Sequence, residues 1–157
     1  FMYDPKTGKN AGGGPSGWGA AAILSAIEEG LAGIVDTGVC FDTMRFSPRW
    51  CVTPEKSVKY ITGYSVSHAF VETQYEETPD ALCFRLRCPS REIECHILLP
   101  EGFEAKQVTV DGTSAAFRRL TAGGSVYVDF TILRPGQPPH DPARYRPQAA
   151  LDIRVER

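Results

Sequence analysis

The sequence lacks a strong excess of charge of either sign, and it lacks any long apolar run. Seventeen Lys and Arg residues nearly balance 19 Asp and Glu residues among 157, so the formal net charge is −2. The basic residues are scattered, and their longest run is Arg118-Arg119. Nucleic acids and anionic membranes select a clustered basic face, and a membrane-spanning helix needs about 20 apolar residues. We therefore expect neither a nucleic-acid partner nor a membrane partner.

The sequence also lacks an even number of cysteines. The chain has five of them, at Cys40, Cys51, Cys83, Cys88 and Cys95. An odd number cannot be paired completely within one chain, and free thiols are commoner in reducing compartments. This favours a cytoplasmic location.

A recognisable metal motif is absent. Cys83, Cys88, Cys95 and His96 lie close together in the sequence and offer the ligand types that zinc prefers. Their spacing does not match a two-residue zinc knuckle, and strand alternation places Cys83 and Cys88 on opposite faces. We interpret these cysteines as structural, and we expect no metal and no cofactor.

Catalytic motifs are absent as well. His68, His96 and His140 stand in no arrangement that would activate a nucleophile. The glycine-rich stretch before the first helix has no strand before it and no lysine after it, so it fails as a phosphate loop. Glu28 and Glu29 are adjacent on a helix and point about 100° apart, so they cannot flank one substrate atom. We expect no catalytic residue in this chain.

One convincing helix is present, within residues 12–34. Apolar residues repeat at spacings of three and four, at Leu24, Ile27, Leu31 and Ile34. Ser16 is a candidate N-cap and Gly33 a candidate C-cap. Ala and Ile residues widen the apolar surface to most of the circumference, which is typical of a helix buried on several sides. The helix therefore needs neighbours that the rest of the sequence does not offer.

The remainder has the two-residue period of strands. We expect strands at 41–46, 58–62, 66–70, 81–88, 92–99, 125–133 and 151–155, and a hairpin around Asp111-Gly112 within 106–117. The segments 81–88 and 92–99 are expected to pair as a hairpin, 151–155 to be an edge strand, and the proline-rich stretch 134–147 to be an extended surface excursion. Seven or eight short strands predict a mainly β protein, an antiparallel β-sandwich preceded by one α-helix.

Three features stand together between Gly17 and Trp50: Trp18 at the helix start, Leu31-Ala32-Gly33-Ile34 at its end, and a strand closed by Phe46-Ser47-Pro48. With these features the segment is similar to a recurring ending in bacterial glycoside hydrolases with a six-hairpin α/α barrel catalytic domain, and the α-L-rhamnosidase-like members resemble it most. The later segment CHILLPEGFEAKQVTVDG resembles the Leu-Pro turn and Val-x-Val-Asp-Gly hairpin of the following sandwich. Many members have a His just before the Trp, where this chain has Pro15-Ser16-Gly17.

The resemblance implies two parts. Residues 1–35 would be a flexible loop and the final helix of an otherwise absent barrel, and residues 36–157 a C-terminal β-sandwich accessory domain. The partners would be the upstream catalytic barrel of the same polypeptide and a carbohydrate. The catalytic carboxylates would lie earlier in the barrel, so this chain by itself is expected to be inactive. Trp18, with the Ser16 hydroxyl, would line the substrate pocket of the intact enzyme.

Two other functions remain open. The chain could be a freestanding carbohydrate-binding module in which Trp50, Tyr64 and Tyr75 stack on sugar rings. It could also be a β-sandwich interaction domain that dimerises through its exposed helix. Exposed coplanar aromatic rings would favour the first alternative, and an exposed apolar helix would favour the second or the glycosidase segment.

Overall fold

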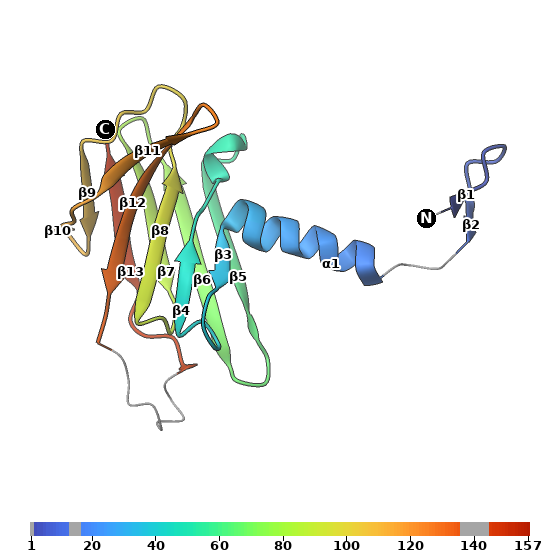
Figure 1. The fold of residues 1–157 in the computed structure, drawn as a ribbon, viewed down its shortest axis with the longest axis horizontal. Helices are drawn as coiled ribbons and strands as arrows, with labels where there is room; N and C mark the ends of the chain where they lie inside the picture. Colours follow the sequence, from blue (N-terminus) through green and yellow to red (C-terminus); the bar gives the residue numbers. More distant parts are fainter. Residues whose placement is uncertain (1, 13–16, 136–144) are drawn as a thin grey trace.

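The structure, a computed structural model, describes residues 2–12, 17–135 and 145–157. Two sheets pack face to face, and a helix precedes them in the chain (Figure 1). The predicted fold class, an antiparallel β-sandwich preceded by one α-helix, is therefore confirmed. A small hairpin near the N-terminus pairs β1 (Met2–Tyr3) with β2 (Asn10–Gly12).

The first layer is a six-stranded antiparallel sheet in the order β10-β9-β13-β7-β6-β5. Its strands are β5 (Ser57–Tyr64), β6 (Ala69–Glu77), β7 (Ala81–Arg87), β9 (Gln107–Val110), β10 (Thr113–Ser114) and β13 (Leu151–Glu156). The predicted turn at Asp111-Gly112 joins β9 to β10, and both residues have positive φ. That conformation suits a two-residue hairpin, so this prediction is confirmed.

The second layer is a five-stranded sheet in the order β11-β12-β8-β4-β3. Its strands are β3 (Ile34–Asp36), β4 (Thr43–Phe46), β8 (Glu92–Leu98), β11 (Arg118–Ala122) and β12 (Ser125–Leu133). β4 runs parallel to β8, and the other neighbours are antiparallel. A short 3-10 helix, η2 (Trp50–Val52), follows β4.

The core lies between the two sheets and is built from the alternating residues of each strand. In β7, Leu82, Phe84 and Leu86 are buried while Arg85 and Arg87 are exposed, as the sequence predicts. In β8, the inward residues are Ile93, Cys95 and Ile97. Phe46 and Phe84 meet edge to face across the core with ring centroids 5.6 Å apart, so aromatic contact joins the two layers.

The predicted hairpin between residues 81–88 and 92–99 is wrong. β7 and β8 belong to different sheets, and β7 pairs with β6 and β13 instead. Between them the chain crosses from one layer to the other at Pro89 and the buried Ser90, whose hydroxyl donates a hydrogen bond to the Phe41 carbonyl (2.6 Å). The crossing lets both strands turn their apolar faces into one core.

Other strand predictions need correction. Residues 65–68 form the turn between β5 and β6, so the expected strand at 66–70 begins only at Ala69. The C-terminal strand β13 lies between β9 and β7 and is not an edge strand. β3 and β11 were not anticipated, because β3 has three residues and β11 has no buried residue. Residues 136–144 of the proline-rich stretch lie outside the described residues.

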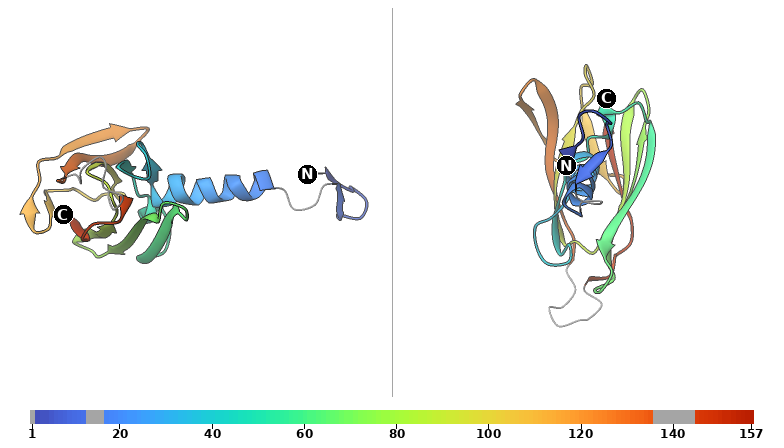
Figure 2. Two further views of the ribbon diagram at one scale, coloured as in Figure 1. Left: turned by 90° about the horizontal axis from the view of Figure 1, so that it is seen from below. Right: turned by 90° about the vertical axis from the view of Figure 1, so that its right-hand side faces the viewer.

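The helix begins as α1 (Gly17–Ser25) and continues as a π-helix, η1 (Ala26–Ala32). Gly33 ends it in the left-handed conformation (φ 69°), and its N–H donates to the Glu28 carbonyl, so the predicted C-cap is confirmed. The helix leaves the sandwich at the edge where β3 and β5 end the two sheets (Figure 2).

Replacing Gly33 with alanine tests this junction. A Cβ at Gly33 would lie 2.0 Å from the Ser47 carbonyl carbon, and its φ is positive, so Gly33→Ala should lower the free energy of unfolding by about 3 kcal/mol or more. Gly102→Ala is the matched control, because Gly102 has φ +70° and open space around it; we expect a loss of about 1 kcal/mol. Urea denaturation followed by circular dichroism measures both, and equal losses would contradict the steric argument.

Candidate functional site

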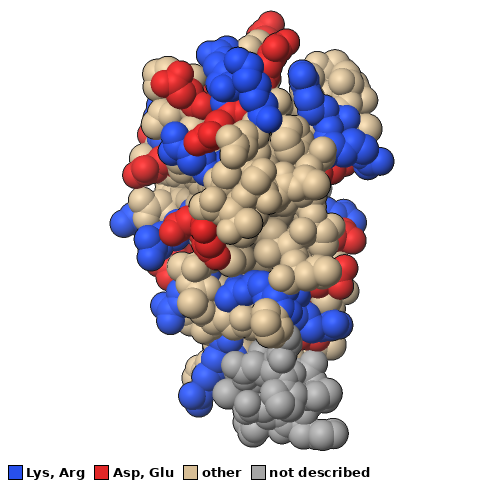
Figure 3. All heavy atoms as spheres, turned by 90° about the vertical axis from the view of Figure 1, so that its left-hand side faces the viewer, with Lys and Arg blue, Asp and Glu red and all other residues tan. Residues whose placement is uncertain are grey.

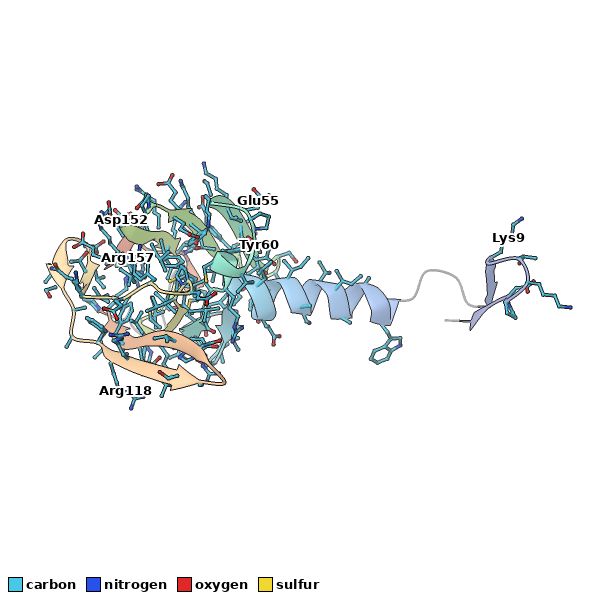
Figure 4. All side chains as sticks on the ribbon, turned by 90° about the horizontal axis from the view of Figure 1, so that it is seen from above. Lys9, Glu55, Tyr60, Arg118, Asp152 and Arg157 are labelled. Atoms are coloured by element: carbon cyan, nitrogen blue, oxygen red, sulfur yellow. The ribbon has the colours of Figure 1, made fainter. Side chains whose placement is uncertain are left out.

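The helix exposes a group of large apolar side chains to solvent. Of residues 17–32, only Ala32 is buried. The side chains of Trp18, Ile23 and Leu24 are 89%, 65% and 63% exposed. Figure 4 shows the helix reaching away from the sandwich with its side chains in open space. Exposed apolar residues on one element mark an interaction surface.

The C-terminal end of the helix is fixed to both sheets. After β4, the Arg49 guanidinium donates to the Gly30 carbonyl (3.0 Å), and the Arg49 backbone N–H donates to the Leu31 carbonyl (2.9 Å). On β5 of the other sheet, the Thr62 hydroxyl donates to the Glu28 carboxylate (2.9 Å). The sandwich therefore sets the direction in which the helix leaves it.

Further apolar side chains are exposed on β5 and in the turn of the β5–β6 hairpin. Ile61 and Val66 are exposed there, beside a shallow hollow of about 430 Å³. Tyr64 stacks on Phe41 with centroids 5.0 Å apart and donates its hydroxyl to Asp36 (3.0 Å). Burial, and then the hydrogen bond to Asp36, raises the pKa of Tyr64 to about 12, so its hydroxyl stays protonated.

A second surface lies on the outer face of the five-stranded sheet, where polar side chains form two rows across the strands. In the first row, Arg118, Asp129 and His96 are directly opposite one another on β11, β12 and β8. In the second, Arg45 on β4 lies opposite Glu94 on β8. We call these five residues the polar ladder. Its members on β4, β8 and β12 face outward because the residues on either side of them in each strand are buried in the core.

Short contacts hold the ladder together. His96 Nδ1 lies 2.6 Å from one Asp129 carboxylate oxygen, and the Arg118 guanidinium lies 3.2 Å from the other. Because a carboxylate only accepts, Nδ1 of His96 carries the proton in this contact. The His96 ring also stacks on Tyr127, with centroids 4.1 Å apart and planes 12° apart. Arg45 lies 3.6 Å from Glu94.

The ladder borders a hollow of about 680 Å³, which Ser47, Arg49 and Thr131 also line.

A different side of the molecule carries charged groups around an uncharged area. Figure 3 shows the side that carries β9 and the edge strands β10 and β11, where groups of both signs surround a largely uncharged middle.

The residues considered for zinc do not come together. Cys88 and Cys95 are buried in the core, while His96 lies on the outer face of β8 and Cys83 on the outer face of β7. The sulfur of Cys83 accepts a hydrogen bond from Arg154 at 3.4 Å. Among the residues that the structure describes, no group of three or more His, Cys, Asp or Glu side chains is placed to hold a metal ion.

The other candidate residues are scattered. Trp18 is at the free end of the helix, and Ser16 lies outside the described residues, as does His140. His68, expected in a strand, is in the β5–β6 turn with φ +56°. Glu28 bonds Thr62, and Glu29 is exposed.

The aromatic residues of the binding-module alternative do not form a platform. Trp50 and Tyr75 are buried, and only Tyr64 of the three is exposed. Trp50 packs against Tyr60, and the Tyr75 hydroxyl donates to Glu77 (2.6 Å). Two of the three rings thus belong to the interior.

The polar ladder is the arrangement that the sequence pattern does not reveal. Alternation along β8 and β12 places His96 and Asp129 on outward faces. The pairing of β8 with β12 brings them opposite each other, and this pairing joins strands separated by more than 25 residues. No short-range signal in the sequence specifies it.

No family model matches the sequence, and no curated protein matches it. A solved structure, an alpha-L-rhamnosidase from Dictyoglumus thermophilum, aligns with a TM-score of 0.49 and 16% sequence identity over 81% of this chain. The chain spans 12% of the length of that structure. No helix within the described residues is both long enough and apolar enough to cross a bilayer.

The cysteine environments predict an order of thiol reactivity. Burial raises the pKa of Cys88 and Cys95, and burial followed by the charge of Glu77 raises the pKa of Cys51 to about 11. The thiolate is the reactive form, so a disulfide reagent at pH 8 should modify the half-exposed Cys83 quickly in the native protein and Cys88 and Cys95 only after unfolding.

Cys83→Ser should remove a fast phase that Cys95→Ser leaves intact. We expect all five thiols to react in denaturant and elemental analysis to find no zinc. One tightly held equivalent of zinc would contradict the structural interpretation of the cysteines.

Proposed function

We propose that this chain is the C-terminal segment of a carbohydrate-active enzyme, an α-L-rhamnosidase-like glycoside hydrolase with a six-hairpin α/α barrel. In this proposal, residues 1–35 contribute the last barrel helix, and residues 36–157 form the accessory sandwich that supports the barrel. The active site belongs to the upstream part of the same polypeptide. The proposal rests on the sequence resemblance around Trp18, Leu31–Ile34 and Phe46–Pro48, and on the exposure of the helix.

The exposed helix is the observation that carries the proposal. Burying one side chain such as Leu24 or Ile23 stabilises a protein by about 1.5–3 kcal/mol, and here the whole apolar circumference is left in water. A second copy of the chain would cover one side of the helix. Neighbouring helices of a barrel would cover several sides, which matches the way Ala and Ile residues surround it.

The attachment of the helix suggests what the sandwich contributes. Arg49, in the segment after β4, and Thr62, on β5 of the other sheet, both hold the helix end. A helix anchored in this way presents its free turns at a fixed angle. The sandwich would then position the last helix of the barrel and close that side of the catalytic domain.

Leu24→Ala tests the proposal by comparing two lengths of the protein. In the isolated chain Leu24 is mostly exposed, so the change should alter the free energy of unfolding by about 0.5 kcal/mol or less. In the full-length parent the same side chain would be in a helix-packed core, and the loss should be about 2–5 kcal/mol.

Leu133→Ala is the matched control, because Leu133 is 75% exposed on β12 and should matter little in either protein. Equal, small effects of Leu24→Ala in both lengths would overturn the barrel assignment. A concentration-dependent loss of stability in the isolated chain would instead support dimerisation through the helix.

Trp18 is the residue of this chain that we place nearest the substrate. It stands at the free end of the helix, where an entry loop of the barrel would border the sugar pocket. An aromatic ring there could stack on a pyranose face, a contact worth about 1 kcal/mol beyond its burial. Ser16, two residues earlier, would supply a hydroxyl partner. The competing role for Trp18 is to fill the gap between barrel and sandwich.

Trp18→Ala in the full-length parent separates these roles. A pocket residue should lower kcat/KM with little change in Tm, whereas a filler should lower Tm and leave activity per folded molecule unchanged. In the isolated chain, where Trp18 is exposed, the substitution should not change stability. The isolated chain should not hydrolyse aryl rhamnosides, and turnover by it would contradict the absence of a complete active site.

A further inference from the structure

The hollow beside the polar ladder gathers three arginines from three different parts of the fold. Arg45 comes from β4, Arg49 from the segment after β4, and Arg118 from β11. Its volume of about 680 Å³ lies within the range of small-molecule sites, roughly 300–1,000 Å³. The polar ladder itself lies on the sandwich strands, whereas Arg49 also holds the Gly30 carbonyl at the end of the helix.

The charges around the hollow do not cancel. Three arginines and two carboxylate residues, Glu94 and Asp129, line the hollow, which leaves one positive charge in excess (three minus two). One of the three guanidinium groups, that of Arg49, also donates to the Gly30 carbonyl. Each guanidinium has five N–H donors, and Arg118 uses one of its terminal nitrogens on Asp129. Donors therefore remain for a ligand with a single negative charge, and a forked guanidinium is suited to a carboxylate.

The inner part of the site is held more firmly than its rim. Asp129 and His96 are only 21% and 30% exposed, whereas Arg118 is 76% exposed. Asp129 is fixed by His96, and His96 is fixed in turn by its stack on Tyr127. Arg118 is thus anchored at one end of its guanidinium by an ordered carboxylate. Such preorganisation lowers the entropy lost when a ligand binds.

The remaining groups suit hydroxyls. Glu94 can accept hydrogen bonds, and Thr131, directly opposite it on β12, can donate or accept them. A simple anion would engage only the arginines, whereas a polyhydroxylated anion would also use these two residues. We propose that this hollow binds a carbohydrate bearing a carboxylate, the uronic acid unit of an oligosaccharide. The proposal is independent of the barrel assignment, because every residue in it belongs to the sandwich.

Binding of digalacturonate to the 157-residue chain, followed by amide NMR and calorimetry, tests the proposal. We expect shift changes centred on His96, Tyr127 and Thr131, and binding at least about tenfold tighter than that of galactose, which lacks the carboxylate, or of acetate, which lacks the hydroxyls. Acetate binding as tightly as digalacturonate would reduce the site to a simple anion site and overturn the proposal. Shift changes elsewhere, or none, would also overturn it.

Arg118→Ala and Arg45→Ala should each weaken digalacturonate binding by about tenfold. Arg85→Ala is the matched control, since Arg85 is an exposed arginine of β7 that pairs with Asp152 at 3.9 Å. Figure 4 places Asp152 and Arg118 on opposite sides of the sandwich. An equal loss in all three variants would show non-specific attraction and contradict the proposal. Circular dichroism and an Arg118→Lys variant, expected to bind with intermediate affinity, distinguish loss of the contact from loss of the fold.

Discussion

The close approach of Gly33 to the backbone of Ser47 and Pro48 determines how the helix and the sandwich are joined. The Ser47 N–H donates to the Gly33 carbonyl at 2.7 Å, and there is no room for a side chain between them. This contact closes the helix, starts β3, and brings β3 beside β4. It also places Arg49 where its guanidinium reaches Gly30. The direction of the helix and one edge of the five-stranded sheet thus follow from one residue that lacks a Cβ.

The position of the helix at this edge explains why its first turns are exposed and why its last turns are held in place. Its last turns are held by Arg49, after β4, and by Thr62 on β5, while none of the residues of its first turns is buried. Tertiary packing normally supplies most of the stability of a short helix. The π-helical turns of η1 lie at the anchored end, and such turns occur often at functional positions. Tertiary contacts therefore support the helix only at its C-terminal end.

The sequence predicts those features that depend on neighbouring residues. The helix, its glycine cap, the Asp111-Gly112 turn and the alternation of β7, β8 and β12 were all correctly anticipated, because each is set within a few residues. The sequence does not show that β7 and β8 belong to different sheets. Both strands turn an apolar face to one core, and the alternation is the same whether two strands pair within one sheet or face each other across the core. The sequence pattern does not reveal β3, because it is very short, or β11, because all its residues are exposed.

The same limit applies to the polar ladder, with a functional consequence. Alternation that buries Cys95 and Phe130 must expose His96 and Asp129, but only the register between β8 and β12 makes them neighbours. The Arg45–Glu94 pair is exposed on both sides, and such pairs contribute little to stability, typically below about 1 kcal/mol, so the fold does not need it. In the sequence His96 stands among cysteines, a grouping whose spacing does not fit a zinc site, whereas its actual partners lie across the sheet. The polar ladder lies on a face that the core does not constrain. Binding of a ligand, and not packing, can therefore determine which residues occur there.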